Sequence, residues 1–502
     1  MSAAWAQAFS MVFEPYNIVV MLAAALYGLF VGAVPGLTAT MAVALLVPVT
    51  FFMAPIPAIA AVVTATAMAI FSGDIPGCLL RMPGTPASAA YADEAYAMTK
   101  KGQAGLALGA GLVFSAIGGL FGTAVLIVAA PTLAEFALKF SSFEYFWLVL
   151  LGLTCAVFLA SQRPVKGFVS LFLGLLVAAV GLDNPAGIPR FTFGNTELLG
   201  GIGLIPLMIG MFAISEILRF AVESHPRPVI DQQPIGNVLK GMWRLTVAYP
   251  VQILRGSALG TVVGALPGAG ADIAAWMSYA ISKKFSKEPN KFGTGHVEGI
   301  VESGAANNSA LAGAWIPTLV FGIPGDSITA IIIGVLYMKS MNPGPALFLY
   351  NPQNIYAVFL LFIVANLIMI PLGFLCIKAA KQILRVPRNI LMPVIMLFCV
   401  VGAFAINNTV FDIALMMIAG VIAFVLEENG VPIAPAILGV VLGQMLEMNF
   451  VTSMIKADGN LLAFFDRPVA AALGAFTLAV WLLPLLLKRL RGGAQAEGES
   501  ST

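Results

Sequence analysis

The sequence predicts an all-α polytopic membrane protein made of two inverted-topology repeats, and three observations support this fold class. Hydrophobic residues make up 60% of the 502 residues and charged residues only 10%, against about 45–50% and about 25% in soluble domains. Apolar runs of bilayer-spanning length follow one another along the chain, and a Pro-Gly motif recurs in both halves. At about 20 residues per crossing, the chain accommodates roughly 12–15 transmembrane helices with broken helices and re-entrant hairpins between them.

The elements of the first half are seven apolar runs and one interrupted stretch. The runs lie near residues 17–34, 38–54, 57–72, 104–130, 143–161, 166–182 and 198–219. The stretch 75–98 is also apolar, but proline and glycine interrupt it. Since such a segment enters a bilayer only where protein covers its backbone, we expect a re-entrant helical hairpin here.

The second half has the same character. Its runs lie near residues 248–266, 270–282, 303–321, 354–377, 389–406, 410–426, 431–452 and 469–488, and its interrupted stretch is 323–341. We therefore expect a second re-entrant hairpin at 323–341.

The positive charges orient these elements. No Lys or Arg precedes Arg81, so the N-terminus lacks the basic region of a signal peptide and is expected in the periplasm. If each run crosses once, the basic clusters and the C-terminus fall on the cytoplasmic side. The predicted organisation is a first inverted repeat (1–218), a cytoplasmic linker (219–247), a second inverted repeat plus a final transmembrane helix (248–488), and a cytoplasmic tail (489–502).

The internal repeat rests on two Pro-Gly motifs that occur twice in the same order. The first, VGAVPG or VGALPG, contains Pro35-Gly36 and Pro267-Gly268, which we call the break segments. The second contains Pro83-Gly84 and Pro324-Gly325, which we call the tip segments. Seven predicted crossings separate the starts of the two units, and an odd number gives them opposite orientations. Inverted repeats of this kind are typical of secondary transporters.

The break segments predict an ion site. Proline within a helix removes one backbone hydrogen bond, so carbonyl groups one turn earlier become free to bind sodium. Carboxylates within a membrane are costly and are candidates for function. The predicted ion-binding residues are Val31, Pro35, Val263, Pro267, Asp272 and Asp326. The alternatives are that the Pro-Gly pairs only end or kink helices, and that each aspartate only caps a helix.

Helix N-termini and small polar side chains near the same segments predict a carboxylate site, because both present hydrogen-bond donors to an anion. The predicted substrate-binding residues are Gly36, Thr38, Thr40, Gly84, Thr85, Ser88, Gly268, Gly270, Asn307, Asn308, Ser309, Gly325, Ser327 and Thr329. For 307–309 the alternative is hydrogen bonding between helices. Asp74 and Arg81 flank residues 75–77; they either pair with each other or leave Arg81 to contact the anion.

Four long strings resemble the large membrane subunit of the tripartite tricarboxylate transporters (TctA-type). They are VGAVPGLTATMAVALLVPVTF, MPGTPASAAYADEAYAMTKKGQAG, VGALPGAGADIAAWMSYAISKK and FGTGHVEGIVESGAANNSALAGAWIPTLVFGIPGDSITAIIIG. The resemblance implies a permease of the bacterial inner membrane that works with a small membrane subunit and a periplasmic solute-binding protein. It also implies ion-driven uptake of citrate, other di- or tricarboxylates, or aromatic acids.

Other classes of function fit the sequence poorly. No phosphate-binding GxxxxGK[ST] motif is present, and a net charge of +2 offers no basic face for nucleic acid. The two histidines form no HExxH motif, so we expect no enzyme, and no cofactor or metal beyond a coupling sodium. A passive anion channel or pore stays the alternative function. The analogy with elevator transporters suggests a homodimer.

Overall fold

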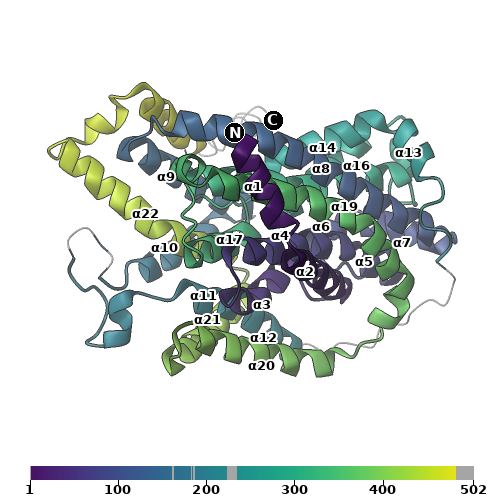
Figure 1. Ribbon diagram of the computed structural model, residues 1–502, viewed down its shortest axis with the longest axis horizontal. Coiled ribbons are helices and arrows are strands. Elements are labelled where there is room, and N and C mark those ends of the chain that lie inside the picture. Colours follow the sequence, from purple (N-terminus) through teal and green to yellow (C-terminus); the bar gives the residue numbers. More distant parts are fainter. Residues whose placement is uncertain (1, 161–162, 183, 185–186, 223–234, 482–502) are drawn as a thin grey trace, which may run out of the picture. The chain divides into compact units, whose positions relative to one another are not determined.

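The computed structural model describes residues 2–160, 163–182, 184, 187–222 and 235–481. Within this part every regular element is a helix, and one isolated antiparallel bridge joins Gly181 and Arg190 (Figure 1). The predicted all-α polytopic class is therefore confirmed. Residues 223–234 of the predicted linker, residues 482–488 of the last run and the whole predicted tail 489–502 lie outside the described residues.

The helices of the first half follow the predicted runs closely. They are α1 (Ser2–Val12), α2 (Pro15–Ala33), α3 (Ala39–Phe51), α4 (Pro55–Ser72), α5 (Asp74–Leu80), α6 (Pro86–Ala89), α7 (Ala92–Lys100), α8 (Ala104–Ala137), α9 (Ser142–Ala160), α10 (Pro164–Ala178), η1 (Thr196–Gly200), α11 (Leu204–Ile209), η2 (Gly210–Ile214) and α12 (Ser215–Val222). The interrupted stretch 75–98 is divided among the short helices α5, α6 and α7, as its prolines and glycines predict.

The second half is equally helical. Its helices are α13 (Met242–Ala248), α14 (Pro250–Gly264), α15 (Gly270–Phe285), η3 (Pro289–Lys291), α16 (Val297–Phe321), α17 (Ser327–Met338), α18 (Pro345–Tyr350), α19 (Pro352–Ile383), α20 (Arg388–Asn407), α21 (Val410–Glu428), α22 (Ala434–Lys456) and η4 (Leu461–Phe465). A further apolar helix covers Pro468–Trp481.

Nine helices of the described residues are long and apolar enough to cross a membrane, and four more are apolar but shorter. Three of these shorter helices, α3, α10 and Pro468–Trp481, correspond to predicted crossings, whereas α17 lies in the predicted re-entrant stretch 323–341. Helix α8 is longer than expected, because it continues through Pro131 to Ala137. Helix α1 was not predicted; its Trp5 ring stacks on Tyr356 of α19 with the ring centroids 4.4 Å apart.

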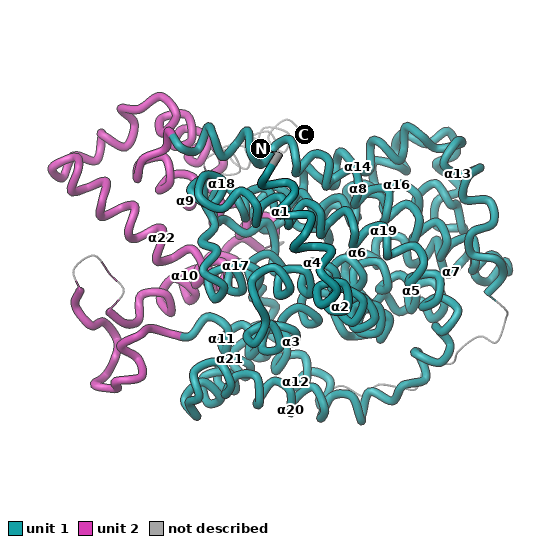
Figure 2. The backbone as a smooth tube through the Cα atoms, in the orientation of Figure 1, with its two compact units in different colours: residues 1–138, 203–433 teal, residues 139–202, 434–502 magenta. Residues whose placement is uncertain are grey.

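The chain divides into two compact units (Figure 2). Unit 1 comprises residues 1–138 and 203–433, and unit 2 comprises residues 139–202 and 434–502. Each unit combines segments from both halves of the sequence, so the predicted repeat boundaries stay a prediction. All four Pro-Gly segments belong to unit 1.

Two helices form the interior of unit 1. In α4 every residue from Ile56 to Ser72 is buried, and in α16 every residue from Glu298 to Val320 is buried. Helix α4 packs against α2, and α16 packs against α8, α14 and α15. A helix buried on all faces lies inside a bundle. Helices α4 and α16 therefore form the interior against which the helices next to the break segments pack.

Unit 2 is a smaller bundle in which α22 packs against α9 and α10. Its contacts are close because Gly174 lies against the backbone of Ala436, where a Cβ would be 1.9 Å from the carbonyl oxygen. The Trp147 indole donates a hydrogen bond to the carbonyl oxygen of Phe464 at 2.9 Å. Unit 2 contains none of the predicted site residues.

Candidate functional site

The tip segments have the same local structure in both halves. Thr85 is the N-cap residue of α6 and accepts a hydrogen bond from the Ser88 backbone N–H at 3.2 Å. Asp326 is the N-cap residue of α17 and accepts one from the Thr329 N–H at 2.8 Å. In both cases the side chain of the third helical residue bonds back to the cap, which completes a capping box. Aligning Pro83-Gly84 with Pro324-Gly325 places Thr85 opposite Asp326 and Ser88 opposite Thr329, and the geometry of the two caps matches this alignment.

The turns that lead into the tip segments also match. Arg81 and Gly322 both adopt left-handed backbone conformations, with φ of 59° and 69°. Two hydrogen bonds close the preceding helix at equivalent positions: Arg81 to Gly77 and Met82 to Pro76 in the first half, and Gly322 to Thr318 and Ile323 to Pro317 in the second. The same helix ending thus precedes both tips.

In each half, the glycine of the tip segment packs against the last turn of the helix that precedes the break segment, which is α2 in the first half and α14 in the second. A Cβ at Gly84 would lie 2.5 Å from the carbonyl oxygen of Gly32, and a Cβ at Gly325 would lie 2.5 Å from that of Gly264. In the second half the contact is completed by a hydrogen bond from the Gly268 N–H to the Gly325 carbonyl at 2.8 Å. Both positions therefore require glycine, because no side chain has room there.

The two repeats contact each other reciprocally. Helix α15, which follows the second break segment, packs against α6, which follows the first tip segment. Helix α3, which follows the first break segment, packs against α17, which follows the second tip segment. The Trp276 indole on α15 donates to the carbonyl oxygen of Pro86 at 3.2 Å. Such exchanged contacts are expected of two repeats related by a pseudo-two-fold axis.

Asp272 and Asp326 come together at one of these contacts. Asp326 lies against Gly270, where a Cβ would be 2.6 Å from the Asp326 Cβ. The Asp272 carboxylate faces the backbone N–H of Ala87 and lies close enough to Asp326 for the two charges to repel. Within the described residues neither carboxylate pairs with a Lys or Arg. Two neighbouring carboxylates without a basic partner suit a bound cation.

The structure corrects the prediction that the break segments leave backbone carbonyl groups free. Helix α2 ends at Ala33 and α14 ends at Gly264, so Pro35 and Pro267 follow helix ends and do not interrupt helices. The carbonyl of Val31 accepts a hydrogen bond from the Val34 N–H at 3.2 Å, and the carbonyl of Val263 accepts one from Leu266 at 3.0 Å. The prediction that these carbonyls are free is therefore wrong, although each keeps one lone pair.

The first break segment lies beside an arginine that sequence reasoning missed. Gly36 has a φ of 87°, and Thr38 caps α3 by accepting from the Met41 N–H at 3.1 Å. The Arg388 Nη1 is 3.2 Å from the position that a Gly36 Cβ would take. Arg388 is half-buried, and the Glu216 carboxylate attracts its charge, but no hydrogen bond or salt bridge to Arg388 occurs among the residues that the structure describes. No local pattern links position 388 to position 36, so the sequence offered no signal for this contact.

The remaining predicted substrate residues are spread over several contacts. Thr40 and Ser327 lie partly buried in the first turns of α3 and α17. Residues 307–309 lie in the middle of α16 and face three different partners: Asn307 donates to the Tyr91 hydroxyl, Asn308 to the Met369 sulfur and Ser309 to the Ala306 carbonyl. The structure therefore does not gather them at the tips.

Arg81 pairs with Asp93 and not with Asp74. The Arg81 Nε is 2.7 Å from Asp93 Oδ1, and both side chains are largely exposed. Asp74 instead accepts a hydrogen bond from the Tyr91 hydroxyl. Of the two sequence alternatives for Arg81, the pairing with Asp74 is therefore wrong.

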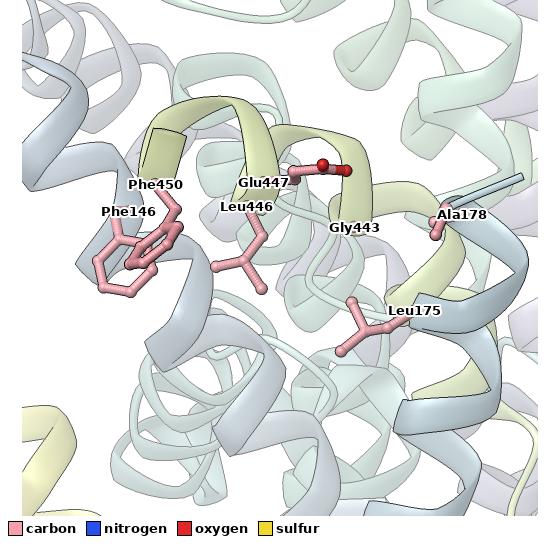
Figure 3. A pocket seen from close by; sticks show the side chains of 8 residues that line it. Phe146, Leu175, Ala178, Gly443, Leu446, Glu447 and Phe450 are labelled. Carbon is pink, nitrogen blue, oxygen red and sulfur yellow. The ribbon is translucent and has the colours of Figure 1, made fainter. Parts of the chain in front are cut away.

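A cavity of about 280 Å³ in unit 2 is a poor carboxylate site (Figure 3). Figure 3 shows the rings of Phe146 and Phe450 at one end and the side chains of Leu175 and Leu446 along the wall. The single carboxylate in its lining, Glu447, is already bound by both terminal nitrogens of Arg190 at 2.7 Å. Its walls are otherwise hydrocarbon, and a dicarboxylate would find no free donor there.

Comparisons with known proteins agree with this architecture. The model of the Tripartite tricarboxylate transporter TctA family matches residues 18–438. An uncharacterized 52.8 kDa protein in the TAR-I ttuC' 3' region of Agrobacterium vitis is 34% identical over 478 residues, or 95% of each chain. An uncharacterized protein in the TAR-II ttuC' 3' region of the same organism is 34% identical over 227 residues, which cover 45% of this chain and 94% of that protein. No solved structure matches significantly.

Proposed function

Because the chain belongs to the tripartite tricarboxylate transporter TctA family, we propose that it is the permease that takes up carboxylates by sodium-coupled secondary transport. The observation that carries this proposal is the meeting of the two repeats at their Pro-Gly segments, where Asp272 and Asp326 lie together beside the helix that Thr85 caps. The substrate would be a di- or tricarboxylate such as citrate, or an aromatic acid.

At this contact sodium would neutralise negative charge. Asp272 and Asp326 are neighbouring carboxylates, and an anionic substrate that approached them would be repelled. A bound cation removes that repulsion, so sodium binding would precede or accompany substrate binding. Ionisable groups that line such sites in transporters are functional by default.

The substrate carboxylates would meet donors at the first break and at the tips. Arg388 supplies a positive charge beside Gly36, and Glu216, which attracts this charge, is itself paired with Arg219. Guanidinium groups bind carboxylates through two parallel hydrogen bonds. The N-termini of the capped helices add backbone and hydroxyl donors, with Thr85, Ser88 and Thr329 nearest to them.

The transport cycle would move the tips of one repeat relative to the other. A periplasmic binding protein would deliver the substrate to the outward-facing permease, and a small membrane subunit would complete the assembly. We place the chain in the bacterial inner membrane with its N-terminus in the periplasm and its C-terminus in the cytoplasm. A homodimer is the proposed oligomer.

Uptake into proteoliposomes tests the proposal. The permease, its small subunit and its binding protein would be supplied together with labelled citrate, succinate or an aromatic acid. We expect uptake to require an inward sodium gradient, and Asp272→Asn to abolish that requirement together with most of the uptake. The control is Asp93→Asn, which removes only an exposed ion pair. Sodium-independent equilibration in the wild type would instead identify a passive anion pore.

A further inference from the structure

Unit 1 contains a buried acid that the proposed function does not use. Asp74 is the first residue of α5 and is 5% exposed. Its Oδ1 accepts a hydrogen bond from the Tyr91 hydroxyl at 2.7 Å. Its Oδ2 is buried and has no hydrogen-bond partner among the described residues. The carboxyl group therefore has one neutral donor and one unsatisfied oxygen.

In the part of the chain that the structure describes, no basic group pairs with Asp74 from the elements that pack against α5. These elements are α2, α4, α6, α7 and α8. The titratable groups closest to it are the Tyr91 hydroxyl and the Cys78 thiol, while α4 and α6 carry no ionisable side chain.

The other titratable groups on these helices are engaged elsewhere. On α7, Asp93 pairs with Arg81, Glu94 accepts from the Tyr279 hydroxyl, and Lys100, in the last turn, lies over the Tyr96 ring with its Nζ 5.1 Å from the ring centroid. Tyr27 of α2 donates to the carbonyl oxygen of Ala42, and Tyr16 of the same helix is exposed. Glu135, the sole ionisable residue of α8, lies at the far end of that helix from Gly111. None of these groups offsets a negative charge on Asp74.

An ionised carboxylate in this place would be strongly unfavourable. Burying a charge costs much free energy unless a partner compensates it, and a single neutral hydroxyl does not. The charge must therefore be removed by a bound cation or by a proton.

The side chains around Asp74 favour the proton. Gly111 lies beside Oδ2, because a Cβ built on it would be 2.8 Å from this oxygen, and a glycine offers no side-chain ligand. A metal cation needs several oxygen ligands around it, and the described residues contain no group of three or more His, Cys, Asp or Glu side chains that could hold a metal ion. A proton needs only one oxygen. We propose that Asp74 is a proton-binding site and that the acid is neutral in this conformation.

Tyr91 connects this proton site to the contact between the repeats. Its hydroxyl oxygen accepts a hydrogen bond from Asn307 Nδ2 at 3.4 Å, and Asn307 belongs to α16 of the second repeat. The Asn307 Oδ1 is buried, and no described residue donates a hydrogen bond to it. A movement of the first hairpin relative to α16 would break this chain of hydrogen bonds and expose Asp74 to water. The acid would then release to one side the proton that it took from the other.

The coupling step, which rests on the proposed function, adds a proton to the transported ions. The Asp74 carboxylate takes up one proton on the periplasmic side and becomes a neutral acid. The neutral acid permits the hairpin to pack, and it returns to a carboxylate when it releases the proton to the cytoplasm. No electron transfer and no other bond change is involved.

Infrared difference spectroscopy of the purified protein tests the protonation without any transport. At neutral pH, wild type minus Asp74→Asn should contain the carbonyl stretch of a protonated carboxyl group. Wild type minus Asp93→Asn should lack it, because Asp93 is an exposed ion-paired carboxylate. Tyr91→Phe keeps the acid but removes its hydrogen bond, so it should shift the band without abolishing it. This variant also serves if Asp74→Asn fails to fold. Absence of the band in wild type would overturn the proposal.

Reconstituted vesicles with an internal pH dye test the coupling. Substrate uptake should acidify the lumen in wild type and in Asp74→Glu but not in Asp74→Asn. Acidification that persists in a folded Asp74→Asn protein would overturn the coupling role. If wild type takes up no substrate at all, the proposed function fails while the infrared result still decides the protonation of Asp74.

Discussion

Single glycines set the closest contacts of the candidate site. Gly84 and Gly325 occupy equivalent positions, and each would place a Cβ 2.5 Å from a backbone carbonyl oxygen. Gly111 similarly leaves room for the Asp74 carboxyl group. At these positions the absence of a side chain is what the structure requires.

The Gly84→Ala and Gly325→Ala variants should therefore both be destabilised. The added methyl group meets rigid backbone, and overpacking of this kind costs about 1–3 kcal/mol. Thermal unfolding in detergent measures the effect. Gly236→Ala is the control, because nothing lies within 4 Å of its Cβ position. Equal stability of Gly325→Ala and wild type would mean that the tip is not packed as described.

Arg388 carries the second prediction at the residue scale. Its guanidinium lies beside Gly36 without a described ion-pair partner. If it binds a substrate carboxylate, Arg388→Gln loses a charged hydrogen bond of about 1.5–3 kcal/mol, so KM for uptake should rise at least about tenfold. The neighbouring, exposed Arg385 provides the matched variant Arg385→Gln. An unchanged KM in Arg388→Gln would remove Arg388 from the site.

At the scale of elements, helix caps and ion binding make different demands on Asp326. Its Oδ1 accepts the Thr329 N–H and so caps α17. Asparagine is an equally good cap, whereas alanine costs about 1 kcal/mol. The two substitutions therefore separate a capping role from a charge role.

Asp326→Asn should keep the thermal stability of the wild type but lose the sodium dependence of uptake. Asp326→Ala should lose both. Unfolding curves and uptake at several sodium concentrations measure the two properties side by side. Retained sodium dependence in Asp326→Asn would favour the alternative that this aspartate only caps a helix.

The helices were largely predictable because apolar runs and their Pro and Gly boundaries are local signals. The run 389–406 became α20 (Arg388–Asn407), and 354–377 became the longer α19 (Pro352–Ile383). The motif spacing also predicted which residues are equivalent, as the two capping boxes show. Helix α1 was missed because its short, mixed sequence lacks a long apolar run.

The contacts between distant segments were not predictable. No spacing rule brings Arg388 to Gly36 or Asn307 to Tyr91. Such contacts depend on how helices from both repeats pack, which a single sequence does not encode in any periodic pattern.

At the scale of the whole molecule, the repeated motifs explain how one chain builds the proposed transport site. Each repeat supplies a helix that follows its break segment and a capped helix that follows its tip segment, and α6 packs on α15 while α17 packs on α3. The two compact units both draw on the two halves of the sequence (Figure 2). The proposed alternating access requires two nearly equivalent arrangements, and a reciprocal contact between the predicted inverted repeats would provide them.

The steady-state accumulation ratio in proteoliposomes tests the central claim most directly. Labelled carboxylate inside and outside would be measured for the complete assembly while the sodium gradient is varied at constant pH and membrane potential. The account predicts an internal concentration above the external one that rises with the gradient and falls to equality when the gradient is dissipated. A ratio that stays at one for every gradient, despite measurable entry, would contradict coupled uptake.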